Sequence, residues 1–232
     1  MCSSDLIVSH DLQEPLRTVE SYIVLLREDY AQVIDSDIDN HLRSMSSSIQ
    51  RMSALIRHIL HYGQLEKDKK MSEVDCNKLL RSVCEDLSGI ITKFGAVITI
   101  VEMPVILCYE TELRQVFQNL IHNAIKFKRP GITPEIRVES KVCENFMEFV
   151  VSDNGTGIDS KYFHKIFEIF HKLPGTSNLE GYGVGLANCA KIVALHRGKI
   201  WVESSQGNGS TFKFTIPINN KLYENDPTNN VN

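Results

Sequence analysis

Residues 119–127 read Asn-Leu-Ile-His-Asn-Ala-Ile-Lys-Phe, and this segment gives one helix two different faces. At about 3.6 residues per turn, Asn119, Asn123 and Lys126 share a polar stripe, and apolar residues occupy another side. Amide oxygens are hard ligands that suit Mg²⁺, and a lysine one turn further on can meet a phosphate. The segment therefore predicts a helix at residues 112–127 that carries metal-binding and phosphate-binding groups. The alternative is the solvated side of an ordinary helix, which is also polar.

Helix and strand patterns alternate on both sides of this segment. Helical spacing of apolar residues occurs at residues 77–87, 112–127 and 184–196, and strand-like runs occur at residues 97–101, 136–142, 146–152, 199–203 and 211–216. Such interleaving predicts an α/β domain, which we place at residues 69–218. The polar, Asn-rich residues 219–232 lack periodicity, and we expect them to form a disordered tail.

Residues 1–68 show a different pattern, in which apolar residues recur three and four positions apart on either side of a polar break at residues 35–37. The two runs are Leu12, Leu16, Val19, Ile23, Leu26 and Tyr30, then Leu42, Met45, Ile49, Met52, Ile56 and Ile59. This spacing predicts a two-helix hairpin whose second helix is capped by Ser36 or Asp37. Two amphipathic helices cannot enclose a core, so we expect two copies to form a four-helix bundle and the chain to be a homodimer. The alternative is a hairpin that packs on its own C-terminal domain.

The composition of the 232 residues is that of an ordinary globular chain: 42% are hydrophobic, 23% are charged, and the formal net charge is −4. This charge gives no electrostatic reason to expect nucleic-acid binding or attraction to an anionic membrane. The sequence contains no uncharged apolar run of about 18 residues and no signal-peptide pattern at its start. We therefore expect no transmembrane segment and a cytoplasmic location. Its six cysteines should be reduced, since none lies in a Cys-x-x-Cys pair.

A histidine stands early in the first helical run, where residues 9–17 read Ser-His-Asp-Leu-Gln-Glu-Pro-Leu-Arg. If Leu12 and Leu16 lie in the apolar seam, His10 faces solvent. Asp11 beside it could hold the proton on one ring nitrogen, which leaves the other lone pair free to attack an electrophile. The pattern predicts a nucleophilic histidine, with an ordinary solvated histidine as the alternative.

Two glycine-rich segments suit a nucleotide. Asp153 follows an apolar strand, so its carboxylate could accept a hydrogen bond from an exocyclic amino group, while Gly155 and Gly157 would let the backbone approach a flat ring. The alternative is an ordinary turn. Residues 181–186, Gly-Tyr-Gly-Val-Gly-Leu, open a helix whose N–H groups could face a phosphate. The polar run at residues 171–180 would suit a mobile lid.

In their order and spacing, these segments resemble the sensor histidine kinases of two-component signalling over about residues 5–217. Residues 9–11 resemble the H-box of that family, residues 119–127 the N-box, residues 153–157 the G1 box, residues 163–170 the F-box and residues 181–186 the G2 box, and residues 207–212 match the following strand. The H-box is most similar to that of kinases attached to phytochrome-type sensors. The implied fold is a two-helix hairpin in a dimeric four-helix bundle, followed by an α/β sandwich of the gyrase, chaperone and histidine kinase ATPase type.

The resemblance also implies a role for each matching residue. His10 would be the phosphoacceptor and Asp11 its general base, in a dimerisation and phosphotransfer domain at residues 1–68. The implied ligands of ATP and Mg²⁺ are Asn119 and Asn123 for the metal, Asp153 for the adenine amino group, Gly155 and Gly157 beside the base, Gly181, Gly183, Gly185 and Leu186 at the phosphates, Lys126 and Lys172 as further phosphate contacts, and Thr211 in the following strand.

The implied activity is transfer of a phosphoryl group from ATP to His10 and then to an aspartate in the receiver domain of a response regulator. The chain begins nine residues before His10, so we expect the upstream sensor domain to lie outside it, and that sensor would set any membrane association. Two positions depart from the family pattern. Glu14 stands where many members carry a Thr or Asn linked to phosphatase activity, and Tyr182 replaces the usual Thr.

Three other functions are alternatives to histidine phosphorylation, and the sequence offers evidence on each. An ATPase or chaperone-like machine of this fold would carry a water-activating Glu four residues before the metal-binding Asn, and Asn119 occupies that position. A non-catalytic dimeric scaffold would bind ATP, or nothing, and dock a regulator. A serine kinase of the anti-sigma type would not need the hairpin that carries His10.

Overall fold

The computed structural model describes residues 4–30, 33–64, 70–174 and 183–218, and the chain divides into two compact units, Met1–Lys67 and Asp68–Asn232. Within the first unit, the side chains of residues 4–13, 50, 51 and 54–64 are outside the description. The predicted tail at residues 219–232 and the glycine Gly181 also lie outside the described residues. We describe each unit by itself.

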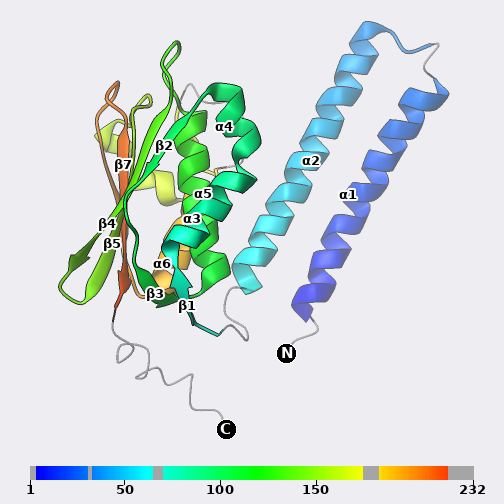
Figure 1. The fold of residues 1–232 in the computed structure, drawn as a ribbon. Helices are drawn as coiled ribbons and strands as arrows, with labels where there is room; N and C mark the ends of the chain where they lie inside the picture. Colours follow the sequence, from blue (N-terminus) through cyan, green and yellow to red (C-terminus); the bar gives the residue numbers. More distant parts are fainter. Residues whose placement is uncertain (1–3, 31–32, 65–69, 175–182, 219–232) are drawn as a thin grey trace. The chain divides into compact units, whose positions relative to one another are not determined.

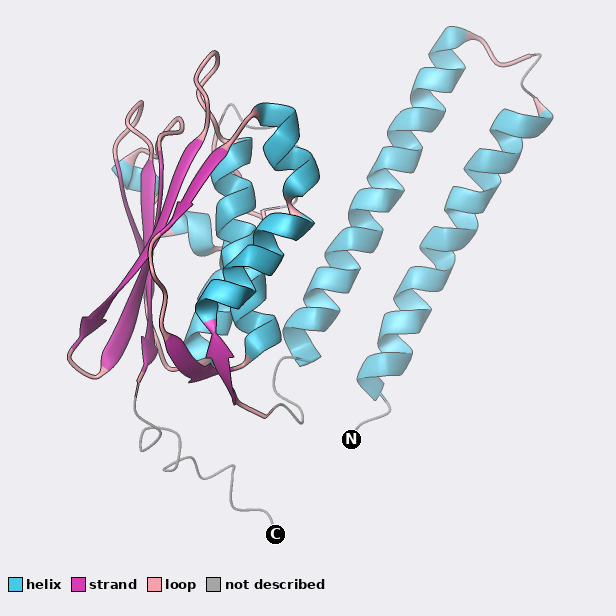
Figure 2. Cartoon of the chain, in the orientation of Figure 1, coloured by secondary structure: helices cyan, strands magenta, loops and turns pink. Residues whose placement is uncertain are grey.

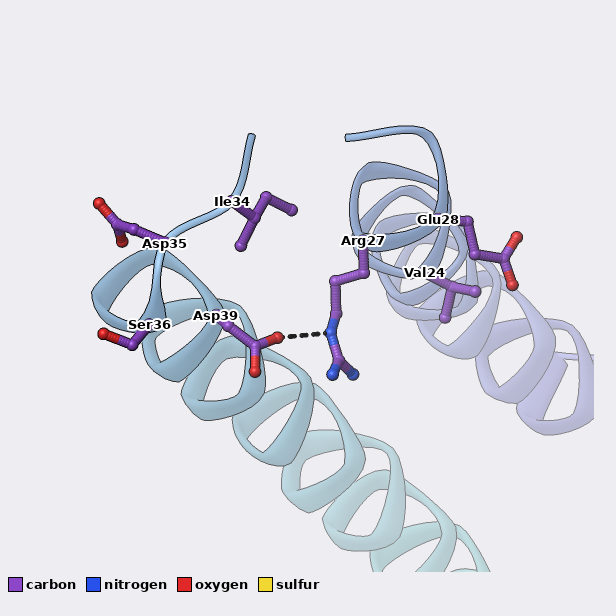
Figure 3. A pocket seen from close by; sticks show the side chains of 7 residues that line it. All are labelled: Val24, Arg27, Glu28, Ile34, Asp35, Ser36 and Asp39. Atoms are coloured by element: carbon purple, nitrogen blue, oxygen red, sulfur yellow. Dashed lines mark hydrogen bonds and ion pairs between the residues drawn. The ribbon is translucent and has the colours of Figure 1, made fainter. Parts of the chain in front are cut away.

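The first unit is a helical hairpin made of α1 (Ser4–Asp29) and α2 (Ser36–Gln64) (Figure 1). The prediction that Ser36 or Asp37 caps α2 is wrong, because the Asp35 carboxylate accepts the hydrogen bond from the Ile38 backbone N–H at 2.7 Å. A second contact joins the two helices beside this turn, where the Arg27 Nε donates to the Asp39 carboxylate at 2.9 Å. Figure 3 shows this pair at the edge of a pocket of about 550 Å³.

The apolar seam of the hairpin is only partly covered within one chain. Ile23 and Ile49 are buried, at 5% and 6% exposure. Five other predicted seam residues are 43% to 57% exposed: Val19, Leu26, Tyr30, Met45 and Met52. The hairpin therefore keeps a large apolar surface that one copy of the unit does not bury.

The second unit is built on a five-stranded sheet in the order β2-β4-β5-β7-β6 (Figure 2). The strands are β2 (Val97–Ile100), β4 (Glu135–Cys143), β5 (Phe146–Asp153), β6 (Ile200–Ser204) and β7 (Ser210–Pro217). Strands β2 and β4 are parallel, and the other neighbours are antiparallel. A small antiparallel pair, β1 (Ser72–Asp75) with β3 (Val105–Cys108), lies apart from this sheet.

Helices cover one face of the five-stranded sheet (Figure 1). They are α3 (Cys76–Asp86), α4 (Ser88–Phe94), α5 (Glu110–Lys126) and α6 (Gly185–Leu195), and two short 3-10 turns span Ser160–Tyr162 and Lys165–Phe167. The centre of the core is aromatic: Phe117 of α5 meets Phe149 and Phe214 edge-on at 5.5 Å between ring centroids. All three rings are fully buried. The α/β architecture predicted from the sequence is thus present, and this core fixes α5 against the middle strands.

Several features of the second unit differ from the sequence prediction. Strands β1 and β3 and helix α4 were not predicted, because each is too short for a clear apolar period. The five cysteines that the structure describes carry free thiols. In the described part of the chain, no helix combines the length and apolar character that a membrane span requires.

Candidate functional site

The site begins at Asp153, the last residue of β5. Its Oδ1 accepts hydrogen bonds from the backbone N–H of Gly155 at 2.7 Å and of Ser210 at 3.2 Å. Burial raises the pKa of this carboxyl above its ordinary value, and the two N–H donors oppose that shift. Among the described residues, both of these hydrogen bonds go to the same oxygen, which leaves Oδ2 for a donor from a ligand.

Glycines around Asp153 are required by the packing of backbone on backbone. A Cβ on Gly157, where φ is +69°, would lie 2.1 Å from the Ser205 carbonyl oxygen. A Cβ on Gly209, where φ is +81°, would lie 1.9 Å from the Asp153 carbonyl oxygen. At both positions any other residue would be strained and would collide with backbone. The glycines thus let the loop after β5 pack closely against the β6–β7 turn. From the sequence, the glycines after Asp153 were expected only to make room for a flat ring.

The loop after β5 also touches the end of α5. The Thr156 N–H donates to the Phe127 carbonyl at 2.9 Å, and a Cβ on Gly155 would lie 2.6 Å from the same oxygen. Asn123 lies one turn earlier and is partly exposed. Lys126 places its Nζ 4.7 Å from the Phe127 ring centroid. The structure therefore brings the Asp153 loop together with the polar end of α5.

The other end of the polar stripe on α5 meets the start of α6. The Asn119 side-chain oxygen is 3.2 Å from where a Cβ on Gly185 would stand, so only glycine fits there without a shift. Gly183, with φ at +71°, packs against the His171 carbonyl oxygen, which a Cβ would approach to 2.7 Å. Val184, the N-cap residue of α6, makes no side-chain hydrogen bond to the first turn. The N–H groups of that turn, at the positive end of the helix dipole, are thus suited to an anion.

Helix α5 therefore joins two halves of one site. Asn119 lies beside α6 and Phe127 lies beside the Asp153 loop, and the eight residue steps from Asn119 to Phe127 span about 12 Å along the helix. A carboxylate with one available oxygen stands at the first half, and a helix N-terminus without a side-chain cap stands at the second. This arrangement suits a ligand with a flat amino-bearing ring at one end and an anionic group at the other.

Thr211 does not join this group, and the role of Lys172 stays a prediction. The Thr211 hydroxyl is 3.1 Å from the Ser152 hydroxyl, and both residues lie on the face of the sheet opposite Asp153. The residue that stands across from Asp153 is Ser210, which the sequence analysis missed. The alternation of Phe212, Phe214 and Ile216 on β7 is the signal that would have placed Ser210 on the buried face. Lys172 is exposed, and Leu186 is partly buried in the first turn of α6.

His10 and Asp11 lie on α1, but their side chains are outside the described part of the structure. Their roles, and the role of Gly181, stay predictions.

The side chains on α5 fit Mg²⁺ in one respect. Asn123 offers a hard amide oxygen, and Mg²⁺ usually takes only one or two protein ligands beside the phosphates of its substrate. Asn119 is less available, since its amide oxygen packs against Gly185. Asn123 is therefore the better candidate for a metal ligand. Within the described residues, no cluster of three or more His, Cys, Asp or Glu side chains could hold a metal ion by itself.

Comparisons with known proteins agree with this geometry. Residues 108–220 match the family described as "Histidine kinase-, DNA gyrase B-, and HSP90-like ATPase". The chain is 39% identical over 215 residues to the phytochrome-like protein Cph1 of Synechocystis sp., which covers 92% of this chain and 29% of that protein. The chain thus spans under a third of that relative's length.

Solved structures are also similar to this one. Full-length ShkA in complex with AMPPNP aligns with a TM-score of 0.69 and 26% identity, over 92% of this chain and 45% of that chain. The nucleotide-free catalytic domain of histidine kinase ThkA aligns with a TM-score of 0.55 and 29% identity, over 64% of this chain and 98% of that chain.

Proposed function

We propose, for a chain that belongs to the histidine kinase family, that it transfers the γ-phosphoryl group of ATP to His10 and then to an aspartate of a response regulator. One observation carries the ATP-binding half of this proposal: the Asp153 loop and the first turn of α6 meet opposite ends of the same helix, α5. The similarity to ShkA, which was solved with AMPPNP, supports the same nucleotide class.

The base of ATP would bind at Asp153. Its Oδ2 would accept a hydrogen bond from the adenine amino group, while the N–H groups of Gly155 and Ser210 hold Oδ1 in place. A hydrogen bond to an ionised acceptor contributes about 1.5–3 kcal/mol, which corresponds to about 10- to 100-fold in affinity. The ionised carboxylate is a stronger acceptor than the protonated acid. Because the pKa of Asp153 is raised, acidification should weaken this hydrogen bond at a higher pH than it would for an ordinary Asp.

The phosphates would bind at the N-terminus of α6, near Asn119 and Asn123 of α5. Asn123 would hold Mg²⁺, which neutralises charge on the phosphates during transfer. Lys126 and the glycines of residues 181–185 would make further phosphate contacts. Positioning and charge neutralisation, rather than covalent chemistry by the protein, would supply most of the rate enhancement.

His10 would be the nucleophile. A lone pair on one imidazole nitrogen would attack the γ-phosphorus, a new N–P bond would form, and the bond to the β,γ-bridging oxygen would break to release ADP. Asp11 would accept the hydrogen bond from the other ring nitrogen and so favour the reactive tautomer. The phosphoryl group would pass next to a receiver-domain aspartate, where an O–P bond replaces the N–P bond.

The hairpin would dimerise through its apolar seam. The exposed side chains of Leu26, Met45 and Met52 lie at seam positions, and burying them against a second copy would remove apolar surface from water. We infer a homodimeric four-helix bundle from this surface. It would place two copies of His10 in one assembly.

Hydrolysis of ATP is a weaker candidate than transfer. An amide cannot act as a general base, and Asn119 stands where a water-activating carboxylate would be needed. The side chain of Asn119 is also engaged with α6, beside Gly185. The scaffold function predicts nucleotide binding without phosphorylation, so the experiment below separates it from the kinase.

The test is incubation of the purified chain with γ-labelled ATP and Mg²⁺. We expect acid-labile, alkali-stable label on the wild-type protein and none on His10→Gln or Asn123→Ala. His41→Gln is a matched control, because His41 is an exposed histidine on the other helix of the hairpin and should keep the label.

Asp153→Asn tests the contact with the base, through the affinity of the folded protein for ATP. The amide oxygen can still accept the N–H groups of Gly155 and Ser210, but an NH₂ group replaces Oδ2 and would face the adenine amino donor. We expect a folded protein that binds ATP at least tenfold more weakly. Label that persists on His10→Gln, or unchanged ATP affinity in Asp153→Asn, would contradict the proposal.

A further inference from the structure

We propose that Arg129 is a positioning residue for the adenine end of the site, where it clamps two backbone segments together without touching the nucleotide. This inference deepens the proposed function and rests on it. Arg129 lies in the segment between α5 and β4, outside all the motifs that the sequence analysis singled out.

The guanidinium of Arg129 bonds to both loops that border Asp153. Its Nε donates to the Asn154 carbonyl oxygen at 2.7 Å, directly after Asp153. Its Nη1 donates to the Gly207 carbonyl oxygen at 3.1 Å, in the turn between β6 and β7. One side chain therefore spans the loop after β5 and the turn that leads to Ser210.

Three neighbouring hydrogen bonds make this contact part of a larger clamp. The Gly207 N–H donates to the Thr156 carbonyl at 2.7 Å, so the two loops are bonded on both sides of Gly207. The Ser204 hydroxyl accepts from the Ile158 N–H at 2.8 Å and donates to the Gly209 carbonyl at 2.6 Å. Arg129 adds a further hydrogen bond to this group, at Asn154, the residue next to Asp153.

The side chain of Asn154 fixes the other side of the same peptide. Its Oδ1 accepts from the Glu135 N–H at 3.0 Å, and its Nδ2 donates to the Thr133 carbonyl at 3.0 Å. The Asn154 carbonyl is thus presented to Arg129 from a residue that is already tied to β4. Movement of this peptide would shift the Asp153 carboxylate, because the two residues are adjacent.

Arginine is required for this geometry because its donors are fixed in a planar fork. Two donors of one rigid group can reach two carbonyls on separate loops, and less side-chain freedom is lost per bond. A lysine carries the same charge on a single flexible donor group and would not hold both carbonyls in the same geometry. Arg129→Lys therefore removes the clamp while it keeps the charge.

The experiment measures the affinity of the full chain for ATP, ADP and adenosine by competition with a fluorescent ATP analogue. We expect Arg129→Lys and Arg129→Gln to weaken all three ligands by the same factor, about fivefold, with kcat of autophosphorylation unchanged at saturating ATP and KM raised. Arg137→Lys is the matched control: Arg137 also donates through Nε, to Glu139 at 2.8 Å, on the exposed face of the sheet. It should leave all three affinities unchanged.

Amide hydrogen exchange of the nucleotide-free protein gives a second readout. Residues 154–158 and 205–209 should exchange faster in Arg129→Lys than in the wild type, while the core strands keep their rates. This measurement stays informative if a variant is too weak a binder for competition.

Three results would overturn the clamp. One is a loss that grows from adenosine to ADP to ATP, which would show that Arg129 binds phosphate directly. Another is a loss in Arg129→Gln but not in Arg129→Lys, which would show that only charge matters. The third is exchange rates equal to wild type in both loops.

If Asp153→Asn weakens the binding of ATP but Arg129→Lys does not, this inference alone fails. If Asp153→Asn binds ATP normally, the proposed function fails, and the exchange rates still decide whether the clamp exists.

Discussion

The two units of this chain differ in how they bury apolar side chains. In the second unit, Phe117, Phe149 and Phe214 are fully buried between the sheet and its helices. In the described part of the hairpin, Ile23 and Ile49 are buried, while Leu26 and its neighbours in the seam stay exposed. The second unit therefore has a complete hydrophobic core within one chain, whereas the described part of the hairpin leaves most of its apolar seam exposed. The comparison indicates that the second unit is a self-sufficient fold. Under the proposed function, the helix that carries His10 would depend on assembly with a second copy.

The largest effect should come from the core of the second unit. Phe117→Ala removes a ring that packs on two other rings, and large-to-small changes of this kind cost about 3–5 kcal/mol. We expect urea unfolding to show this loss for the second unit at every protein concentration. A loss that depended on protein concentration would contradict the view that this core is complete within one chain.

The next effect should come from the hairpin and should depend on concentration. Leu26→Asp places a charge in a seam that we expect a second copy to cover, so the dimer should dissociate at least 100-fold more readily. Analytical ultracentrifugation measures the dissociation constant. Glu28→Gln, a change at an exposed position two residues away, is the control and should keep the dimer. A dimer unaffected by Leu26→Asp would remove the reason for treating the hairpin as incomplete.

These differences also explain how far the sequence could predict the structure. The long elements with a clear period, such as α5 and β5, were predicted because many residues repeat one pattern. Strands β1 and β3, with four residues each, show too few repeats to stand out. Among site residues, Asp153 and Asn123 belong to motifs that are local in sequence.

What the sequence could not give was contact across the sheet. The register between β5 and β7 sets Ser210 across from Asp153 and turns Thr211 to the opposite face, so the residue chosen from the motif was one position away from the one that joins the site. Arg129 had no sequence signal at all, because its acceptors are backbone carbonyls 25 and 78 residues away. Every residue has a backbone carbonyl oxygen, so the sequence does not show which of them accepts a hydrogen bond from Arg129.

A smaller effect should follow from pH, through a buried histidine of the second unit. His196 is buried, and its Nε2 accepts from the Tyr109 N–H at 3.1 Å while its Nδ1 lies 2.8 Å from the Ile192 carbonyl oxygen. Burial lowers the pKa of His196 from its ordinary 6.5. Between 6.5 and the lower folded pKa, the unfolded chain binds a proton that the folded chain does not. Stability should therefore fall as the pH drops below 6.5, by at most about 1.4 kcal/mol per pH unit.

Urea unfolding at a series of pH values measures this dependence. His196→Gln should flatten the decline below pH 6.5, and His164→Gln, at an exposed histidine, should leave it unchanged. An equal slope in wild type and His196→Gln would show that other groups cause the acid sensitivity.

The smallest effect should come from the turn end of the hairpin. Asp39 accepts from Arg27 across the two helices at 2.9 Å and from Arg43 within α2 at 2.7 Å (Figure 3 shows the first pair). The hydrogen bond from Arg43, with the charges of both arginines, lowers the pKa of Asp39 below its ordinary 3.8, so the contribution is present above that pH and is lost on stronger acidification. Because these groups are exposed, salt should screen the attraction between them.

Arg27→Lys should lower the melting temperature of the hairpin slightly at low ionic strength and not at all in 1 M NaCl. Arg43→Lys, which leaves the contact between the helices in place, should have the smaller effect of the two. If Arg27→Lys instead weakened the dimer as much as Leu26→Asp, the turn rather than the apolar seam would hold the hairpin together, and the contrast between the two units would have to be drawn from polar contacts.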